Sequence, residues 1–186
     1  MPADELLRHL VAALEEVGVP YALGGSIASI AYGEPRATLD IDVIASLDTG
    51  NLAAFCAHFP PEDFYLDPDA AAEAVRNGDQ FNIIHPSSGM KIDVFSDRKD
   101  EVAKSQIERS RRLPALPGLT AAFSAAEELI VKKMQYYQLG RSDKHLRDVR
   151  AMLDISGAEI DVGRIQEWVD RLGLGDVWMM VSDPPE

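Results

Sequence analysis

The sequence predicts a mixed α/β fold of the α+β class, in which a β-sheet core with covering helices is followed by a C-terminal helical unit. Up to about residue 118, short runs rich in Ile, Val and Phe alternate with stretches whose apolar residues recur at helical spacing. From Ser124 onward the periodic stretches are helical. We therefore expect a core at residues 1–118 and a helical region at residues 119–186 that packs on the core.

The individual elements follow from hydrophobic periodicity and from turn residues. Apolar residues recur at helical spacing over residues 4–17, and Gly18 is suited to end that helix. Two apolar runs joined by Ser-Ser-Gly predict a hairpin. The expected strands lie at 20–23, 40–47, 80–86 and 90–96. The expected helices lie at 4–17, 26–32, 49–59, 68–78, 98–108, 124–140, 142–156 and 161–174.

Composition bounds the class of protein. With 46% hydrophobic residues in 186, the chain can bury a core, and its length suits one domain or one domain with a small appendage. No apolar run reaches the roughly 18 residues that cross a bilayer, and the acidic N-terminus lacks the features of a secretory signal. The single cysteine, Cys56, excludes an internal disulfide. These features predict a cytoplasmic protein without a membrane partner.

The charge is strongly negative but uneven. The net charge of −13 argues against a general nucleic-acid coat, because phosphate binding needs cations. Residues 98–150 hold 12 of the 18 Lys and Arg residues against seven acids, a local balance of +5. This region, which includes the run Glu-Arg-Ser-Arg-Arg, could face an anionic partner, and a set of solvated surfaces is the alternative.

Three acids in apolar strands suggest a metal site. Asp40 and Asp42 are separated by one residue on an expected strand, so their side chains point to the same face. Asp93 interrupts a second apolar strand. Neighbouring carboxylates repel one another, and a divalent cation such as Mg²⁺ removes that repulsion. Three carboxylates could hold two ions for an in-line phosphoryl displacement. Strand-edge acids that face solvent are the alternative.

A glycine turn upstream of these acids suits an anion. Gly24 and Gly25 have no Cβ, so their backbone N–H groups can approach a phosphate closely. Ser26 is expected at the N-cap of the following helix, whose dipole also favours an anion. Arg36, in the segment that precedes the acid strand, could hold a triphosphate with its forked donors, or it could be a surface arginine.

The combination of these motifs resembles a known signature. Gly-Gly-Ser, then 13 residues, then Asp-Ile-Asp between apolar neighbours, with the later Asp93, is similar to the signature of the nucleotidyltransferase superfamily related to DNA polymerase β. The strong match covers residues 21–45. A Walker phosphate loop and a Rossmann fingerprint are both absent from the sequence.

Within that superfamily, the chain most resembles the AbiEii-like group and its small uncharacterised relatives. Arg36 and Thr38 stand where that group has an Arg-x-Thr or Arg-x-Ser before the acid pair. A weaker match over residues 127–149 places the family lysine at Lys133 and its last aspartate at Asp148. His145 replaces the first aspartate of that last motif. Lys132 remains an alternative to Lys133, and an ion pair with Lys144 remains an alternative for Asp148.

The resemblance implies transfer of a nucleoside monophosphate from an NTP to a hydroxyl group, with release of pyrophosphate. In that reaction Asp40 and Asp42 would hold two Mg²⁺ ions, for which Mn²⁺ could substitute. Asp93 would help to hold one ion and take the hydroxyl proton, and the Gly-Gly-Ser turn would bind the β- and γ-phosphates. Lys133 would contact the nucleotide and Asp148 would orient Lys133.

The resemblance leaves the acceptor open between an RNA end such as that of tRNA, a protein and a small molecule. AbiEii-like proteins are often toxins of toxin–antitoxin pairs, so an antitoxin partner is part of the expectation. The rival hypothesis is a catalytically lapsed nucleotide-binding or protein-interaction module with the same fold.

Overall fold

The computed structural model describes residues 1–32 and 40–182. The chain divides into two compact units. The sheet unit comprises Met1–Ile27 and Ala37–Ser124, and the helical unit comprises Ala28–Arg36 and Ala125–Glu186. The sheet unit therefore extends to Ser124, beyond the limit at residue 118 that the sequence suggests, because residues 119–123 form a strand of the sheet.

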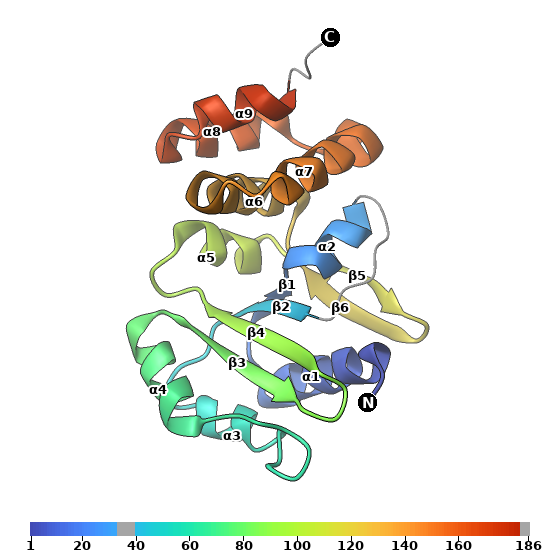
Figure 1. Cartoon of the computed structure of the whole chain (residues 1–186), viewed down its shortest axis with the longest axis vertical. Coiled ribbons are helices and arrows are strands. Elements are labelled where there is room, and N and C mark those ends of the chain that lie inside the picture. The colour runs from blue at the N-terminus through green and yellow to red at the C-terminus, as the bar shows by residue number, and fades with distance from the viewer. Residues whose placement is uncertain (33–39, 183–186) are drawn as a thin grey trace. The chain divides into compact units, whose positions relative to one another are not determined.

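In the described residues, the sheet unit contains a six-stranded mixed sheet (Figure 1) in the order β3-β4-β2-β1-β6-β5. Strand β2 runs parallel to β4 and β1 runs parallel to β6, whereas β1 with β2, β3 with β4 and β5 with β6 are antiparallel. This mixed sheet with its helices confirms the predicted fold class. The strands are β1 (Tyr21–Leu23), β2 (Asp40–Ala45), β3 (Gln80–His85), β4 (Met90–Ser96), β5 (Arg111–Leu116) and β6 (Leu119–Phe123).

One face of the sheet carries the core of this unit. Ile41 and Val43 on β2 and Ile92 and Val94 on β4 are buried, as strand alternation requires, and the residues between them point to the other face. Figure 1 shows α1, α3 and α4 on one side of the sheet and α5 on the other. These helices are α1 (Ala3–Val17), α3 (Leu52–Cys56), α4 (Pro68–Asn77) and α5 (Glu101–Glu108).

The predicted helix boundaries follow from local chemistry. Helix α1 ends at Gly18, which takes the left-handed backbone conformation with φ of 71°, and α4 ends in the same way at Gly78. The side chains of Asp67 and Asp100 accept hydrogen bonds from the first backbone N–H groups of α4 and α5. Helix α2 (Gly25–Tyr32) begins directly after β1.

The C-terminal part of the helical unit contains α6 (Ala126–Gly140), α7 (Asp143–Ser156), the short 3₁₀ turn η1 (Gly157–Glu159), α8 (Val162–Leu172) and α9 (Gly175–Ser182). Helix α6 packs against α7, α8 and α9. Its core includes Ile130, Met134, Val149, Met152 and Ile165, which are all fully buried. Burying a side chain of this size contributes roughly 1.5–3 kcal/mol, so this cluster holds the unit together.

Strands β5 and β6, the turn η1 and helix α9 were not predicted from the sequence. The hairpin of β5 and β6 was missed because β5 carries exposed arginines and Pro114, and these residues are more typical of a loop than of a strand. Proline and charge are tolerated there because β5 is an edge strand. Helix α9 begins at Gly175, directly after the helix expected to end at residue 174. None of the helices in the described ranges combines the length and the apolar composition that crossing a membrane requires.

Tyr21 on β1 forms hydrogen bonds to helix α1 and to strand β6. Its hydroxyl donates to Oε1 of Glu15 on α1 at 3.0 Å and accepts from the backbone N–H of Ala122 on β6 at 3.3 Å. Arg112 on β5 donates to the same Glu15 oxygen at 2.6 Å. Burial is the largest cause that raises the pKa of Tyr21 above its ordinary value. The neutral phenol is therefore part of the folded structure.

We predict that Tyr21→Phe lowers the free energy of unfolding by about 1–2 kcal/mol, because two hydrogen bonds of Tyr21 are lost. Since the pKa of Tyr21 is raised in the folded state, its stabilising contribution is complete below the unfolded pKa of about 10 and is lost as the pH rises through the folded value. The variant should therefore lose less stability than the wild type as the pH rises above about 10. Urea unfolding measures both effects.

Tyr65→Phe is the matched control, because the Tyr65 side chain is 64% exposed. The same loss of stability in both variants would contradict the role given to Tyr21.

Candidate functional site

A row of polar side chains crosses three neighbouring strands of the sheet. Asp42 on β2 pairs in register with Asp93 on β4, and Asp93 pairs with Asn82 on β3. Adjacent strands lie about 4.8 Å apart, so these side chains are direct neighbours on the face opposite the apolar core. Asp40, two residues before Asp42, projects from the same face and is exposed. The structure thus brings together the three acids that the sequence singled out.

Asp93 is held by two neighbours. Its Oδ2 lies 2.8 Å from Nζ of Lys91, which precedes it by two residues on β4. In the amide orientation that satisfies hydrogen bonding, Asn82 donates to the other oxygen, Oδ1, at 2.7 Å. The hydrogen bond to Asp93 is the largest cause that raises the pKa of Lys91, and the charges of Asp93, Asp40 and Asp42 raise it further. Sequence reasoning missed Lys91, although its position on the face of Asp93 follows from strand alternation.

The Gly-Gly-Ser turn lies directly against Asp42. Gly24 donates its backbone N–H to the carbonyl oxygen of Asp42 at 2.9 Å. Gly25 has φ of 53°, and a Cβ added to it would overlap the Oδ2 oxygen of Asp42. Glycine is therefore required at position 25 both for the backbone angle and for the space that the carboxylate fills.

The expected position of Ser26 at the N-cap is wrong. Helix α2 begins at Gly25, so Ser26 lies inside its first turn and is buried. The left-handed angle of Gly25 turns the chain into the helix at that residue. The N-terminus of a helix carries a partial positive charge, so the beginning of α2 suits an anion wherever its first residue lies. The other two residues expected to bind nucleotide, Arg36 and Thr38, lie outside the described residues.

Lys133 and Asp148 form a buried ion pair within the helical unit. Nζ of Lys133 on α6 lies 2.6 Å from Oδ2 of Asp148 on α7, and the two side chains are 6% and 15% exposed. The predicted contact between these residues is confirmed, whereas their part in a reaction stays a prediction. Lys132 instead places its Nζ 5.3 Å from the ring centroid of Tyr136. His145 also lies against that ring, with the centroids 5.7 Å apart.

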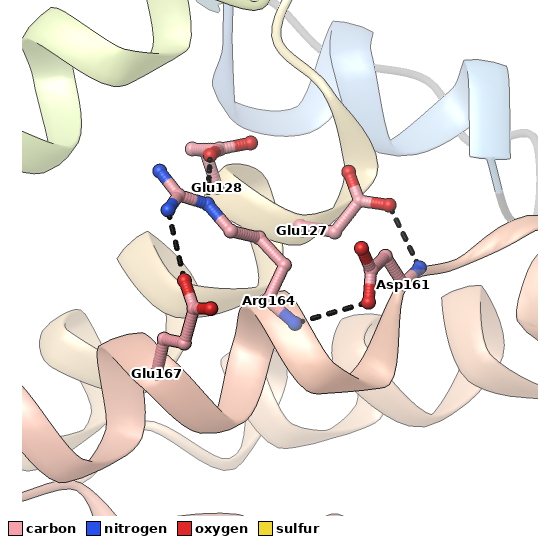
Figure 2. A network of polar contacts seen from close by, with 5 residues as sticks. All are labelled: Glu127, Glu128, Asp161, Arg164 and Glu167. Atoms are coloured by element: carbon pink, nitrogen blue, oxygen red, sulfur yellow. Dashed lines mark hydrogen bonds and ion pairs between the residues drawn. The ribbon is translucent and has the colours of Figure 1, made fainter.

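A second set of buried acids was not singled out from the sequence. Figure 2 shows Glu127 and Glu128, in the first turn of α6, facing the beginning of α8. Oε1 of Glu127 accepts from the backbone N–H of Asp161 at 2.9 Å, and Oε1 of Glu128 accepts from Nε of Arg164 at 3.3 Å. Arg164 also pairs with Glu167. These contacts join the first turn of α6 to the beginning of α8, and the two acids also suit the N-terminus of α6.

The donor chemistry of the acid row suits a divalent cation. Carboxylate oxygens are hard ligands, and Asp42 and Asp93 stand side by side with Asp40 on the same face. In the ranges that the structure describes, no three or more His, Cys, Asp or Glu side chains form a preformed metal-binding group. The bond from Lys91 holds one oxygen of Asp93 in the ion pair described above. A cation would therefore be held by Asp40, Asp42 and Asp93 after a rearrangement of side chains.

The chain is similar to several solved structures. No protein-family model matches the chain, and no curated protein matches it. The crystal structure of ANT(2")-Ia in complex with adenylyl-2"-tobramycin is similar, with a TM-score of 0.61 and 15% identity, over 90% of this chain and 97% of that one. The solution structure of the antibiotic-resistance factor ANT(2'')-Ia matches with a TM-score of 0.59 and 15% identity, over 92% and 94% of the two chains.

An antigenic nucleotidyltransferase-like protein from Paracoccidioides brasiliensis matches with a TM-score of 0.53 and 19% identity, over 83% of this chain and 78% of that one. This chain has the nucleotidyltransferase fold. At identities this low, structural similarity shows the fold alone, and the activity has to be inferred from the site.

We predict that Gly25→Ala lowers the free energy of unfolding by about 2–4 kcal/mol, because it adds an overlap with Asp42 to the strain of a positive φ. Gly89→Ala is the matched control. Gly89 has φ of 69° and no atom near the position of an added Cβ, so that variant should lose only the roughly 1–2 kcal/mol of backbone strain. Urea unfolding measures the free energy of unfolding of both variants. Equal losses would show that the Asp42 carboxylate does not occupy the space beside Gly25.

We also predict that Lys133→Met lowers the free energy of unfolding by about 3–5 kcal/mol, because buried Asp148 loses the cation beside it. The double variant Lys133→Met/Asp148→Leu should recover part of the loss, since no unpaired charge is left behind. Lys104→Met is the control, because this lysine is 67% exposed and its i,i+4 pair with Glu108 is worth well under about 1 kcal/mol. Denaturant unfolding measures all three variants. Equal losses of unfolding free energy in Lys133→Met and Lys104→Met would show that the ion pair with Asp148 does not stabilise the fold.

Proposed function

We propose that this protein is a nucleotidyltransferase that moves a nucleoside monophosphate from an NTP to a hydroxyl group, with a divalent cation such as Mg²⁺. The observation that carries the proposal is the in-register pair of Asp42 and Asp93 with the Gly25 backbone pressed against the Asp42 carboxylate. This arrangement puts acidic oxygen ligands and backbone N–H donors at one end of the sheet. The fold shared with ANT(2")-Ia supports it.

Asp40, Asp42 and Asp93 are the residues that would hold two Mg²⁺ ions, or Mn²⁺ in their place. Bound Mg²⁺ supplies charge neutralisation for the phosphates and lowers the pKa of the acceptor hydroxyl. The parts played by this chain are positioning and electrostatic complementarity, because phosphoryl transfer needs little covalent chemistry from the protein.

The residues of the site have distinct proposed roles. The turn of Gly24, Gly25 and Ser26 is proposed to bind the β- and γ-phosphates, because glycine allows a close approach of the backbone and a helix N-terminus such as that of α2 favours an anion. The N–H of Gly24 is already bonded to the carbonyl oxygen of Asp42, so the proposed contacts come from Gly25 and Ser26. The acceptor oxygen forms a bond to the α-phosphorus while the bond to the bridging oxygen breaks and pyrophosphate leaves. The hydroxyl proton passes to Asp93. Arg36 and Thr38 are proposed to bind the triphosphate on the strength of the family resemblance.

Lys133 and Asp148 enter the proposal through the same resemblance. The ion pair between them fixes the amine of Lys133 on α6, which is what the family role of an oriented lysine requires. Burial of both side chains makes the pair part of the helical core as well. A purely structural pair is the alternative for these two residues.

A cationic small molecule is the acceptor class that the chemistry favours. The chain carries a net charge of −13, which attracts cations and repels a long polyanion. The ANT(2")-Ia structure contains adenylyl-2"-tobramycin, and this chain spans 97% of the length of that protein. A tRNA end or a protein acceptor, and the role of an AbiEii-like toxin with an antitoxin, remain further proposals that rest on the resemblance alone.

A catalytically lapsed nucleotide-binding or protein-interaction module is the second candidate. The observation in its favour is the ion pair between Lys91 and Asp93, which places a lysine among the acids. His145, in place of a family aspartate, points the same way. The intact set of three acids and the glycine turn favours the enzyme.

We predict that the wild type binds an NTP only in the presence of Mg²⁺ and that Asp42→Asn removes this binding while the chain stays folded. The reason is that Asp42 is the acid in contact with both the turn and Asp93. Calorimetry with each of the four NTPs, with and without Mg²⁺, measures the binding. Asp63→Asn, which removes an exposed acid outside the site, is the control.

Binding that survives Asp42→Asn unchanged would place the nucleotide elsewhere and reject the proposed site. Binding by the wild type, followed by turnover with a cationic hydroxyl acceptor, would separate the enzyme from the lapsed module.

A further inference from the structure

Lys91 lies among the three acids of the site. In the pairing of β2 with β4, Lys91 stands opposite Asp40, one row away from the pair of Asp42 and Asp93. Its Nζ is 2.8 Å from Oδ2 of Asp93, and its side chain is 34% exposed. A lysine ammonium is a compact charge on a flexible stem, so it can leave one partner without any movement of the strand.

The electrostatic setting of Lys91 is shared between all three carboxylates. Lys91 is bonded to Asp93 and stands opposite Asp40, and Asp93 stands opposite Asp42, so the positive charge lies beside all three acids. Without the lysine, three neighbouring carboxylates on two strands would repel one another. Lys91 therefore performs, with a single charge, part of the neutralisation that divalent ions would perform at this site.

We propose that Lys91 is a built-in counter-ion that competes with a divalent cation for Asp93 and keeps the affinity of the free protein for that cation low. The inference rests on the proposed function, since it takes the three acids as the cation ligands. A divalent ion must displace the ammonium from Oδ2 of Asp93 before that oxygen can bind it. When no cation is bound, the charge of Lys91 reduces the repulsion between the three acids.

The test measures binding of Mn²⁺ alone to the full chain, by electron paramagnetic resonance of the free ion. Lys91→Met keeps the length of the side chain and removes its charge, so it should bind Mn²⁺ at least about tenfold more tightly than the wild type. Lys91→Arg keeps the charge and should bind Mn²⁺ about as weakly as the wild type. Lys104→Met removes an equal charge from the exposed surface of α5 and should leave the affinity unchanged.

Two further measurements connect the effect to Asp93. In an Asp93→Asn background, Lys91→Met should gain much less Mn²⁺ affinity, because the contested carboxylate is absent. Without metal, Lys91→Met should melt at a lower temperature than Lys104→Met, and Mn²⁺ should raise its melting temperature more than that of the wild type. These readouts depend on folding and binding rather than on turnover, and the melting curves also show whether each variant folds.

The outcomes separate the inference from the proposed function. If the wild type binds Mn²⁺ through Asp42 but Lys91→Met binds it equally or more weakly, the competition is rejected and the proposed site stands. In that case Lys91 orients Asp93 or binds a substrate anion. If Asp42→Asn leaves Mn²⁺ binding unchanged, or if neither the wild type nor Lys91→Met binds Mn²⁺, the acids are not a metal site and both ideas fail.

Discussion

The close approach of the Gly25 backbone to the Asp42 carboxylate is the constraint around which the site is arranged. It requires a residue without a side chain at position 25 and a strand that delivers Asp42 opposite the end of β1. The hydrogen bond from Gly24 to the backbone of Asp42 continues the sheet to that point. The same register places Asp93 beside Asp42, so one pairing scheme positions the turn and both acids.

Charge is neutralised locally in both units. Asp93 is bonded by Lys91 in the sheet unit, while Asp148 is bonded by Lys133 and Glu128 by Arg164 in the helical unit. A buried charge without a partner costs roughly several kcal/mol, so each of these pairs stabilises the fold. Buried Glu127 instead accepts a hydrogen bond from the backbone of Asp161. The pairs differ in accessibility. Lys91 is about one-third exposed and able to exchange its partner, whereas Lys133 is almost fully enclosed and suited to a fixed position.

The fold and the activity stand on different grounds. The similarity to ANT(2")-Ia shows the fold, and one fold can host unrelated functions. The argument for nucleotide chemistry comes from the three acids and the glycine turn, which the fold alone does not require. For the proposed reaction, the net charge of −13 is the feature of this chain that bears on the acceptor most directly, because it attracts cations.

The sequence by itself determined the fold class, most of the elements and the three acids, because these depend on local periodicity and on short motifs. It also indicated the partner of Lys133, through a family resemblance. The hairpin of β5 and β6 was not predictable, because an edge strand tolerates arginine and proline that normally mark a loop.

Only the tertiary structure decided the pairing of strands and the neighbours of each acid. Strand order joins β2 to β4 although about 45 residues of sequence separate them, and no local pattern encodes that register. The contact of Gly25 with Asp42 follows from the pairing of β1 with β2, and the approach of Asp42 to Asp93 follows from the pairing of β2 with β4. The bond between Lys91 and Asp93 is local to β4, but the pairing with β2 sets it beside the other two acids. The sequence carries the chemical groups, and the non-local packing of the sheet sets which of them meet.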